Sequence, residues 1–452
     1  MKRSYFGTDG IRGPYGGPAV NEAFFHALGE AVGRWLRARG PAARTILVGR
    51  DTRSSGASLA RAFGEGVSSA GFDPRYLGVV PTPAVSKAIA RVGAVLGCSV
   101  TASHNPAADN GIKFFAGDGA KLSDQDESEI EAQMGPVPAP AHPVAEAAAG
   151  HAEAFLADYV EDAIRVLPMD ALAGWKVALD TANGATAVTS PAAFRALGAE
   201  VAAIGDRPDG RTINLRVGSE HPEALCALAR SRGSRMGIAH DGDGDRCILC
   251  DETGLVLDGD EVLTLLALEA LRRGTLRNNT LVVTVHSNLG VERAVERAGG
   301  RVVRSCVGDR YVAERMRAEG ASLGGESSGH IVNFDYGATG DGLVAALMVA
   351  SVMLGTGRPL SSLRTDLQRF PQAQRAILVR ERVPLEDLKA LPGVIRSVEA
   401  ELGSRGRVLV RYSGTEPKLR LLVEAASEAE VGAAMERLLA AARSELPLAP
   451  GP

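Results

Sequence analysis

One pattern occurs three times along this chain, and it limits the folds that the chain can adopt. In each copy, a β-branched apolar run ends in polar residues, and a helical stretch, a glycine and a second apolar run follow. The copies begin at "TILVGRDTRSSG", "KVALDTANGA" and "TLVVTVHSNLG". Each is typical of a strand–helix–strand unit, and we expect Gly71, Gly198 and Gly299 to end the helices in a left-handed conformation. The wide spacing of the copies predicts three α/β domains of related build rather than a solenoid.

The last part of the chain predicts a different domain. Strands are expected at "GRVLVRY" and "KLRLLVEA", on either side of "SGTEP". Ser427 and Glu430 have the spacing of a capping box, and apolar residues then recur on one face of the expected helix, at Val431, Met435, Leu438 and Ala442. The Pro- and Ala-rich segment 135–150 predicts a boundary. We therefore predict α/β domains at residues 1–152, 153–253 and 254–368, and an α+β domain at residues 369–452.

The composition argues against several classes of protein. A net charge of −4 is unlike that of a general nucleic-acid binder, which carries a basic face or tail. The first residues lack the apolar core of a signal peptide. The longest apolar run, Leu343 to Leu354, is shorter than the roughly 20 residues of a membrane span. Five cysteines in 452 residues suggest no disulfide framework. We expect a cytoplasmic protein with no nucleic-acid or membrane partner.

The stretch "TASHNPAADNGIKFF", residues 101–115, combines a hydroxyl, an imidazole and an amine. An apolar run leads into it like a buried strand, and Pro106 biases Asn105 away from helix, so the chain should turn sharply. We expect Ser103 to be exposed and firmly held at this turn, as suits a nucleophile or a phosphate carrier. Lys113 supplies the amine. The alternative is a turn serine that only caps the backbone.

A second stretch, "AHDGDGDRC", places Asp241, Asp243 and Asp245 alternately with glycines. Three carboxylates this close repel one another unless a cation lies between them. A site made of oxygen atoms suits Mg²⁺ or Ca²⁺. An EF-hand loop does not fit, because Arg246 stands at loop position six, where that loop needs glycine, and the flanks resemble strands. The remaining alternative is a solvated acidic turn without metal.

Two further loops carry groups that recognise sugars and phosphates. In "GGESSGH", Glu326 can accept hydrogen bonds from two hydroxyls or from an amine. In "RYSGTEPKLR", hydroxyls and the guanidinium groups of Arg411 and Arg420 surround a glycine turn and can form an anion cradle. A flexible loop and a plain surface hairpin are the respective alternatives. Together with Arg12 in "FGTDGIRG", the four stretches indicate phosphoryl transfer to or from a phosphorylated sugar.

These stretches also resemble a known family. "TASHNP", "DGDGDR", "GGESSGH" and "RYSGTEP" are similar to the four signature loops of the α-D-phosphohexomutases, in the family's order and across nearly the whole chain. "FGTDGIRG", "DNGIKFF" and the doubled glycine and serine of "GGESSGH" resemble its phosphoglucosamine mutase branch. The resemblance implies three similar mixed-sheet α/β domains plus a smaller C-terminal α+β domain around a central cleft. It implies an isomerase that interconverts glucosamine 6-phosphate and glucosamine 1-phosphate, for amino-sugar precursors of the cell wall.

The resemblance further implies a role for each matched residue. Ser103 would carry a covalent phosphate, and a hexose 1,6-bisphosphate would be the intermediate and the primer. One Mg²⁺ per subunit would bind to Ser103, Asp241, Asp243 and Asp245. The other implied site residues are Arg12, Lys113, Arg246 and His330 beside the reacting groups, Glu326 and Ser328 on sugar hydroxyls, and Arg411, Ser413, Gly414, Thr415 and Arg420 on the non-reacting phosphate. Relatives of this branch are often dimers, so a homodimer is expected.

Three matters stay open at this point. Either Lys113 or His330 could be the general base that takes the proton of the sugar hydroxyl. The chain could be a phosphoglucomutase or phosphomannomutase of the same enzyme class. From other classes, it could be a phosphosugar-binding protein without catalysis or a calcium-responsive binding module. Ser103, the three aspartates and Lys113 argue against a protein that only binds.

Overall fold

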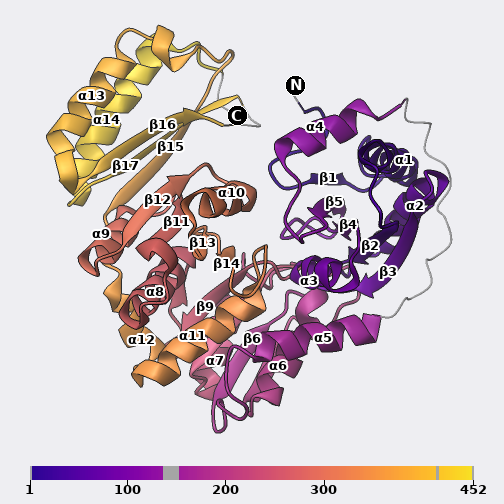
Figure 1. Ribbon diagram of the computed structural model, residues 1–452. Coiled ribbons are helices and arrows are strands. Elements are labelled where there is room, and N and C mark those ends of the chain that lie inside the picture. The colour runs from indigo at the N-terminus through magenta and orange to yellow at the C-terminus, as the bar shows by residue number, and fades with distance from the viewer. Residues whose placement is uncertain (1–2, 136–151, 414–416, 450–452) are drawn as a thin grey trace. The chain divides into compact units, whose positions relative to one another are not determined.

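The computed structural model of the chain describes residues 3–135, 152–413 and 417–449. The chain divides into two compact units, and each is described here by itself. The first unit comprises Met1–His286 and Ala298–Asp366, and the second comprises Ser287–Arg297 and Leu367–Pro452. The first unit contains three sheets and the second contains one (Figure 1).

The three sheets of the first unit share a four-strand arrangement. The first sheet has the order β1-β5-β4-β2-β3 and the second β10-β9-β8-β6-β7. The third, read as β14-β13-β11-β12, matches the last four positions of these orders, and among the described residues it has no counterpart of β1 and β10. Their strands are β1 (Ile11–Pro14), β2 (Thr45–Arg50), β3 (Asp73–Val79), β4 (Leu96–Val100), β5 (Asp109–Ala116), β6 (Lys176–Asp180), β7 (Glu200–Ile204), β8 (Met236–His240), β9 (Cys247–Asp251), β10 (Val256–Leu257), β11 (Thr280–Thr284), β12 (Arg301–Ser305), β13 (Leu323–Gly325) and β14 (Ile331–Asn333).

In each sheet of the first unit, three neighbouring strands are parallel and the strand beside them is antiparallel. The pairs β2/β3, β6/β7 and β11/β12 are parallel, as the repeated strand–helix–strand pattern requires. The pairs β4/β5, β8/β9 and β13/β14 are antiparallel. The loops between the antiparallel partners are the three motif loops, residues 101–108, 241–246 and 326–330. The prediction of three related mixed-sheet α/β domains is therefore confirmed, and the three loops occupy equivalent places in their sheets.

Helices lie along these sheets, and most of them end at a left-handed glycine. The helices of the first unit are α1 (Glu22–Arg39), α2 (Gly56–Ser69), α3 (Thr82–Val92), α4 (Asp124–Ala132), α5 (Ala152–Ile164), α6 (Ser190–Ala196), α7 (Glu223–Arg232), α8 (Gly259–Arg273), α10 (Asp309–Glu319), α11 (Gly342–Thr356) and α12 (Leu360–Leu363), with short 3₁₀ turns η1 (Ala185–Ala187), η2 (Arg277–Asn279) and η3 (Arg364–Asp366). Gly71, Gly198 and Gly299 have φ values of 84°, 90° and 84°, which confirms the left-handed positions expected near the helix ends.

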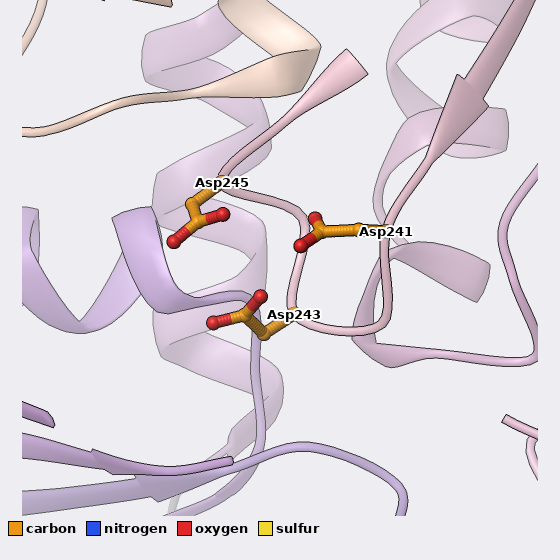
Figure 2. A group of neighbouring side chains, drawn as sticks. All are labelled: Asp241, Asp243 and Asp245. Atoms are coloured by element: carbon orange, nitrogen blue, oxygen red, sulfur yellow. The ribbon is translucent and has the colours of Figure 1, made fainter. Parts of the chain in front are cut away.

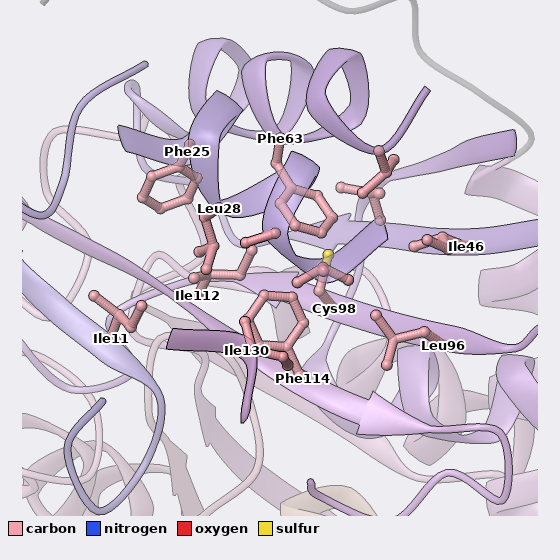
Figure 3. Close-up of a cluster of buried hydrophobic side chains, with 14 of the residues drawn as sticks. Ile11, Phe25, Leu28, Ile46, Phe63, Leu96, Cys98, Ile112, Phe114 and Ile130 are labelled. Atoms are coloured by element: carbon pink, nitrogen blue, oxygen red, sulfur yellow. The ribbon is translucent and has the colours of Figure 1, made fainter. Parts of the chain in front are cut away.

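One core of the first unit lies between α1, α2 and the first sheet (Figure 3). Phe25 and Leu28 from α1 and Phe63 from α2 are completely buried there. The ring of Phe63 packs against that of Phe114 on β5, with 5.6 Å between ring centroids. Burial of each such side chain contributes about 1.5–3 kcal/mol to folding. This core holds the first sheet in place. The Ser103 loop extends from the carboxyl end of β4 in that sheet.

Helices α1 and α2 approach each other at Gly29 and Gly66. A Cβ atom on Gly66 would overlap the carbonyl oxygen of His26, and one on Gly29 would overlap the carbonyl oxygen of Phe63. We expect Gly66→Ala to lower the free energy of unfolding by about 1–3 kcal/mol, because the helices must move apart or strain. Differential scanning calorimetry would show this as a lower Tm.

Gly432 in α14 is the matched control, because a Cβ atom there would meet no other atom within 4 Å. Gly432→Ala should stabilise its own unit by about 0.5–1 kcal/mol, since alanine favours helix more than glycine does. An unchanged Tm for Gly66→Ala would contradict the close approach of the two helices.

Helix α11 is apolar on all sides and is mostly buried within the first unit. Among the residues that the structure describes, no single helix is long and apolar enough to cross a membrane. Within the described ranges, one pair meets the criteria of length and composition together: α11 and the segment Leu360–Asp366, which bends away from it by 92°.

The second unit is a small α+β fold, as predicted. Its antiparallel sheet has the order β15-β17-β16, and its elements are β15 (Gln372–Leu378), β16 (Arg407–Tyr412), β17 (Lys418–Glu424), α9 (Leu289–Arg297), α13 (Leu391–Leu402), α14 (Glu428–Glu445), η4 (Leu385–Asp387) and η5 (Gly403–Arg405). Ser427 is the N-cap of α14 and accepts a hydrogen bond from the Glu430 N–H. The buried face of α14 includes Val431, Met435, Leu438 and Ala442, so this predicted helix is confirmed.

Candidate active site

Ser103 lies three residues after β4 and faces the aspartate loop of the second sheet. Its Oγ donates a hydrogen bond to Asp241 Oδ2 at 2.5 Å. The backbone φ of Ser103 is +52°, a left-handed value that is uncommon for residues other than glycine. Ser103 is completely buried, so the expectation of an exposed serine was wrong. The reason is tertiary: the aspartate loop of another sheet lies over the serine.

The three aspartates converge within one loop (Figure 2). Asp241, Asp243 and Asp245 each offer a carboxylate oxygen, and these oxygens lie within 4.8 Å of one another. All three residues are completely buried. Thr82 Oγ1 and Lys113 Nζ donate to Asp243 Oδ2 at 2.6 and 2.9 Å, and Lys113 Nζ also donates to Asp245 Oδ2 at 2.7 Å. Protein donors therefore orient one oxygen of each of these two carboxylates.

The other oxygens of this cluster suit a metal ion. The Oδ1 atoms of Asp243 and Asp245 are buried and have no hydrogen-bond partner among the residues that the structure describes. A buried anionic oxygen without a partner is costly. Burial, and then repulsion by Asp245 and Asp243, raises the pKa of Asp241 well above its usual range. An oxygen-only set of this kind fits a hard divalent cation. The predicted metal-binding group of three aspartates therefore agrees with the structure.

Lys113 is surrounded by carboxylates. It lies on β5 directly opposite Ser99 of β4, and its buried Nζ is also 3.1 Å from Asp9 Oδ2. Burial alone would lower the pKa of Lys113, but Asp243, Asp245 and Asp9 raise it well above its usual range. These contacts favour the ammonium form of Lys113 and orient the carboxylates of Asp243 and Asp245.

A chain of buried and partly buried charges links this lysine to His330. Asp9 pairs with Arg12 and accepts from Lys121 Nζ at 2.5 Å. Lys121 also pairs with Asp309, whose Oδ2 lies 3.0 Å from His330 Nε2. Burial lowers the pKa of His330, but Asp309 and then Asp245 outweigh this effect and raise it. Arg12 and His330 are thus brought to the same charged network.

The third loop lies beside the aspartates. His330 Nδ1 and Arg246 Nε lie 3.8 and 3.9 Å from Asp245 Oδ1. Glu326 Oε1 accepts from the Gly308 N–H at 2.9 Å, and burial raises the pKa of Glu326. Ser328 lies on the same loop and is partly exposed. The first unit therefore brings together residues from all three motif loops of its sheets.

The predicted phosphate-binding residues belong to the second unit. Arg411 on β16 is the direct cross-strand partner of Arg420 on β17. Guanidinium groups from two neighbouring strands can bind the oxygens of one phosphate. Ser413 is nearly buried, and its N–H donates to the Lys418 carbonyl at 2.8 Å. Gly414 and Thr415 lie outside the described residues.

Several residues of this region were not predicted from the sequence. Asp9 and Lys121 belong to the charged network, Thr82 holds Asp243, and Arg53 and Asn214 contact the Ser103 loop. Asp9 stands in the same glycine-bounded motif as Arg12, and Arg53 follows the end of a parallel strand, where function is expected. Those two positions offered a signal. Isolated residues such as Lys121 and Asn214 offered none.

Comparison with known proteins agrees with this arrangement. Four family models match the chain: phosphoglucomutase/phosphomannomutase alpha/beta/alpha domain I at residues 3–137, domain II at 156–254, domain III at 258–370, and the C-terminal domain at 375–441. A phosphoglucomutase/phosphomannomutase family protein from Burkholderia thailandensis has a similar structure, with a TM-score of 0.78, 25% identity, and coverage of 98% of this chain and 99% of the other.

Relatives of known name match over nearly the full length. The phosphoglucosamine mutase of Alkalilimnicola ehrlichii is 43% identical over 444 residues, covering 98% of each chain. That of Streptococcus thermophilus is 43% identical over 451 residues, covering 98% of this chain and 99% of the other. The chain therefore belongs to the α-D-phosphohexomutase family, and within it to the phosphoglucosamine mutase branch.

Proposed function

We propose that the protein interconverts glucosamine 6-phosphate and glucosamine 1-phosphate, with Ser103 as the phosphate carrier. The observation that carries this proposal is the 2.5 Å contact of Ser103 Oγ with Asp241, inside a cluster of buried carboxylates. A hydroxyl in that place can exchange a phosphoryl group beside a cation site. Membership of the phosphoglucosamine mutase branch supports the choice of an amino sugar.

The proposed metal is Mg²⁺, held by Asp241, Asp243, Asp245 and the phosphate on Ser103. When bound, it would offset negative charge on the transferring phosphoryl group, since phosphoserine adds about −1.5 to −2 charge. The Oδ1 atoms of Asp243 and Asp245, which have no other partner among the described residues, support this assignment. A phosphorylated Ser103 has no hydroxyl proton, so Asp241 Oδ2 would be released from its present hydrogen bond.

The reaction proceeds in two transfers. In the first, the bond between Ser103 Oγ and phosphorus breaks, and phosphorus bonds to the free hydroxyl oxygen of the sugar phosphate. The hydroxyl proton passes to a general base, which is either the unprotonated amine of Lys113 or the unprotonated imidazole of His330. The resulting 1,6-bisphosphate then reorients so that its other phosphoryl group faces Ser103. The oxygen of Ser103 takes this phosphoryl group, and the same base returns the proton to the sugar oxygen that the group leaves. We assign Arg12 and Arg246 to the stabilisation of negative charge on the oxygens of the transferring group.

The remaining predicted residues hold the substrate. We assign Glu326 and Ser328 to sugar hydroxyls and, for Glu326, to the amine as well. The non-reacting phosphate is assigned to Arg411, Ser413, Gly414, Thr415 and Arg420, and the cross-strand arginine pair supports this assignment. The predicted domain boundaries, the homodimer and the cytoplasmic location stay predictions.

A comparison of three substrates tests the proposal. The 1-phosphates of glucosamine, glucose and mannose are assayed side by side, with and without Mg²⁺ and a bisphosphate primer. We expect kcat/KM for glucosamine 1-phosphate to exceed the others at least about tenfold, which corresponds to about 1.4 kcal/mol of extra transition-state binding by a group such as Glu326. Both Mg²⁺ and the primer should be required.

Other outcomes favour the alternatives. A tenfold preference for glucose or mannose 1-phosphate would assign the protein to the phosphoglucomutase or phosphomannomutase activity. Binding of all three sugars without turnover, and without covalent phosphate in the intact mass, would indicate a phosphosugar-binding protein.

A further inference from the structure

The conformation of Ser103 needs support from its surroundings. Its φ of +52° lies in a region that residues with a Cβ atom seldom populate. Such conformations persist only where neighbouring groups hold them, and they occur often at functional sites. The groups that hold Ser103 therefore decide where its Oγ lies relative to Asp241.

One of these groups is Arg53, whose side chain is completely buried. Its NH2 nitrogen donates to the carbonyl oxygens of Ser103 at 3.0 Å and Asn105 at 2.8 Å. Its NH1 nitrogen donates to the carbonyls of Pro106 and, at 2.8 Å, of Asp109. A single guanidinium group thus binds four carbonyls, three in the loop that carries Ser103 and one at the first residue of β5.

Asp51 also supports the loop, because it binds both Arg53 and Thr101. Its Oδ2 accepts from Arg53 Nε at 2.9 Å and from Thr101 Oγ1 at 2.7 Å. Thr101 Oγ1 in turn accepts from the Ser103 N–H at 2.8 Å. The charge of the buried arginine is paired, and both the N–H and the carbonyl of Ser103 are fixed by the same network.

The second group is Asn214, which comes from the part of the chain that carries the second sheet. Its Nδ2 donates to the same two carbonyls, Ser103 at 2.8 Å and Asn105 at 3.0 Å. Gly242 of the aspartate loop packs against this contact, because a Cβ atom there would lie 2.7 Å from the Ser103 carbonyl oxygen and 3.0 Å from Asn214 Nδ2. This contact therefore fixes the position of the serine loop relative to the aspartate loop.

We propose that Arg53 and Asn214 are positioning residues for phosphoryl transfer. They bind the carbonyls of Ser103 and Asn105 from two parts of the chain, fix the left-handed conformation and direct Ser103 Oγ toward Asp241. This inference rests on the proposed role of Ser103 as the phosphate carrier. We call the contacts of Arg53 and Asn214 with these carbonyls the clamp. A displacement of a reacting atom by about 1 Å can cost about 10²-fold in rate, so loss of the clamp should lower kcat.

Asn214→Asp tests the clamp with little change of shape. The variant loses both N–H donors and turns carboxylate oxygens toward two carbonyls. We expect kcat to fall about 10²-fold while KM changes less than about threefold, because positioning affects the transfer step more than substrate binding. Asn214→Gly should lower kcat similarly, since glycine keeps the φ of +60° but removes the side chain.

Asn278 provides a matched control. It is also left-handed, with φ of +53°, and its Nδ2 also donates to two carbonyls, those of Glu319 at 2.9 Å and Gly320 at 3.3 Å. It has no contact with the Ser103 loop among the interactions of the described residues. Asn278→Asp should leave kcat within about twofold of wild type, because it disturbs an equivalent turn away from the site.

The decisive readout is a single turnover with glucosamine 1,6-bisphosphate, in which intact mass follows the phosphorylation of Ser103. Slow phosphorylation in both Asn214 variants, with normal phosphorylation in Asn278→Asp, supports the clamp. Wild-type rates in either Asn214 variant overturn it, and a lower Tm with a normal rate does so too. If the wild-type protein itself is never phosphorylated, the proposed function fails instead.

Discussion

Ser103→Ala should lower kcat at least about 10³-fold, because the variant has no oxygen that can carry the phosphoryl group between the two positions of the sugar. KM should stay within about threefold of wild type, since Ser103 is assigned to transfer rather than to binding of the sugar. The measurement is a steady-state assay with glucosamine 1-phosphate, Mg²⁺ and primer. Intact mass should also show no phosphorylated form of the variant.

A buried serine outside the site serves as the control. Ser86 on α3 is also nearly inaccessible, and its Oγ donates to the Gly119 carbonyl at 2.6 Å. Ser86→Ala should leave kcat within about twofold while costing about 1 kcal/mol of stability. Near-normal turnover by Ser103→Ala would refute the carrier role.

Asp243→Asn should have the second-largest effect. The amide replaces a carboxylate that has one oxygen held by Thr82 and Lys113 and one buried oxygen without a partner among the described residues. We expect kcat to fall about 10²- to 10³-fold, as when a group that stabilises transition-state charge is removed. The concentration of Mg²⁺ needed for half-maximal rate should rise at least about tenfold.

Kinetic titration with MgCl₂ and calorimetric titration of Mg²⁺ measure the two effects separately. Asp209→Asn is the control, because Asp209 is exposed and only caps the turn at Thr212. That variant should titrate like wild type. If Asp243→Asn kept the wild-type affinity for Mg²⁺, the three aspartates would not be the metal site.

The fold was predictable because its signals are local. The three strand–helix–strand copies, the glycines after their helices and the N-cap at Ser427 each depend on residues close in sequence, and the structure confirms them. The repeated order of the sheets also explains the site. Each motif loop connects a parallel strand to its antiparallel neighbour, so three separate motifs occupy equivalent positions.

What was not predictable depends on contacts between distant segments. Ser103 is buried because the loop that begins at Asp241 lies against it, and no residue near Ser103 in sequence reports that contact. Asn214 acts on a loop more than a hundred residues away. Arg53 lay in a quoted motif, but only the structure shows that its guanidinium group binds the carbonyls of the Ser103 loop.

Lys113 illustrates the same limit for the chemistry. The sequence leaves it and His330 as alternative bases, since the family resemblance implies that both lie beside the reacting groups. In the structure, Lys113 contacts Asp9, Asp243 and Asp245, whereas His330 faces Asp309. The charged partners of Lys113 and His330 affect how readily each group can take a proton. Tertiary structure alone brings these partners together.

The most direct test of the account follows one phosphoryl group. Protein phosphorylated on Ser103 is mixed with glucosamine 6-phosphate and Mg²⁺, and the reaction is quenched within a single turnover. The account predicts that phosphate disappears from Ser103 at the rate at which glucosamine 1,6-bisphosphate appears, and that the turnover rate does not exceed this rate. If Ser103 carries an isotopically labelled phosphate at the start, glucosamine 1-phosphate that forms without this label would contradict the account.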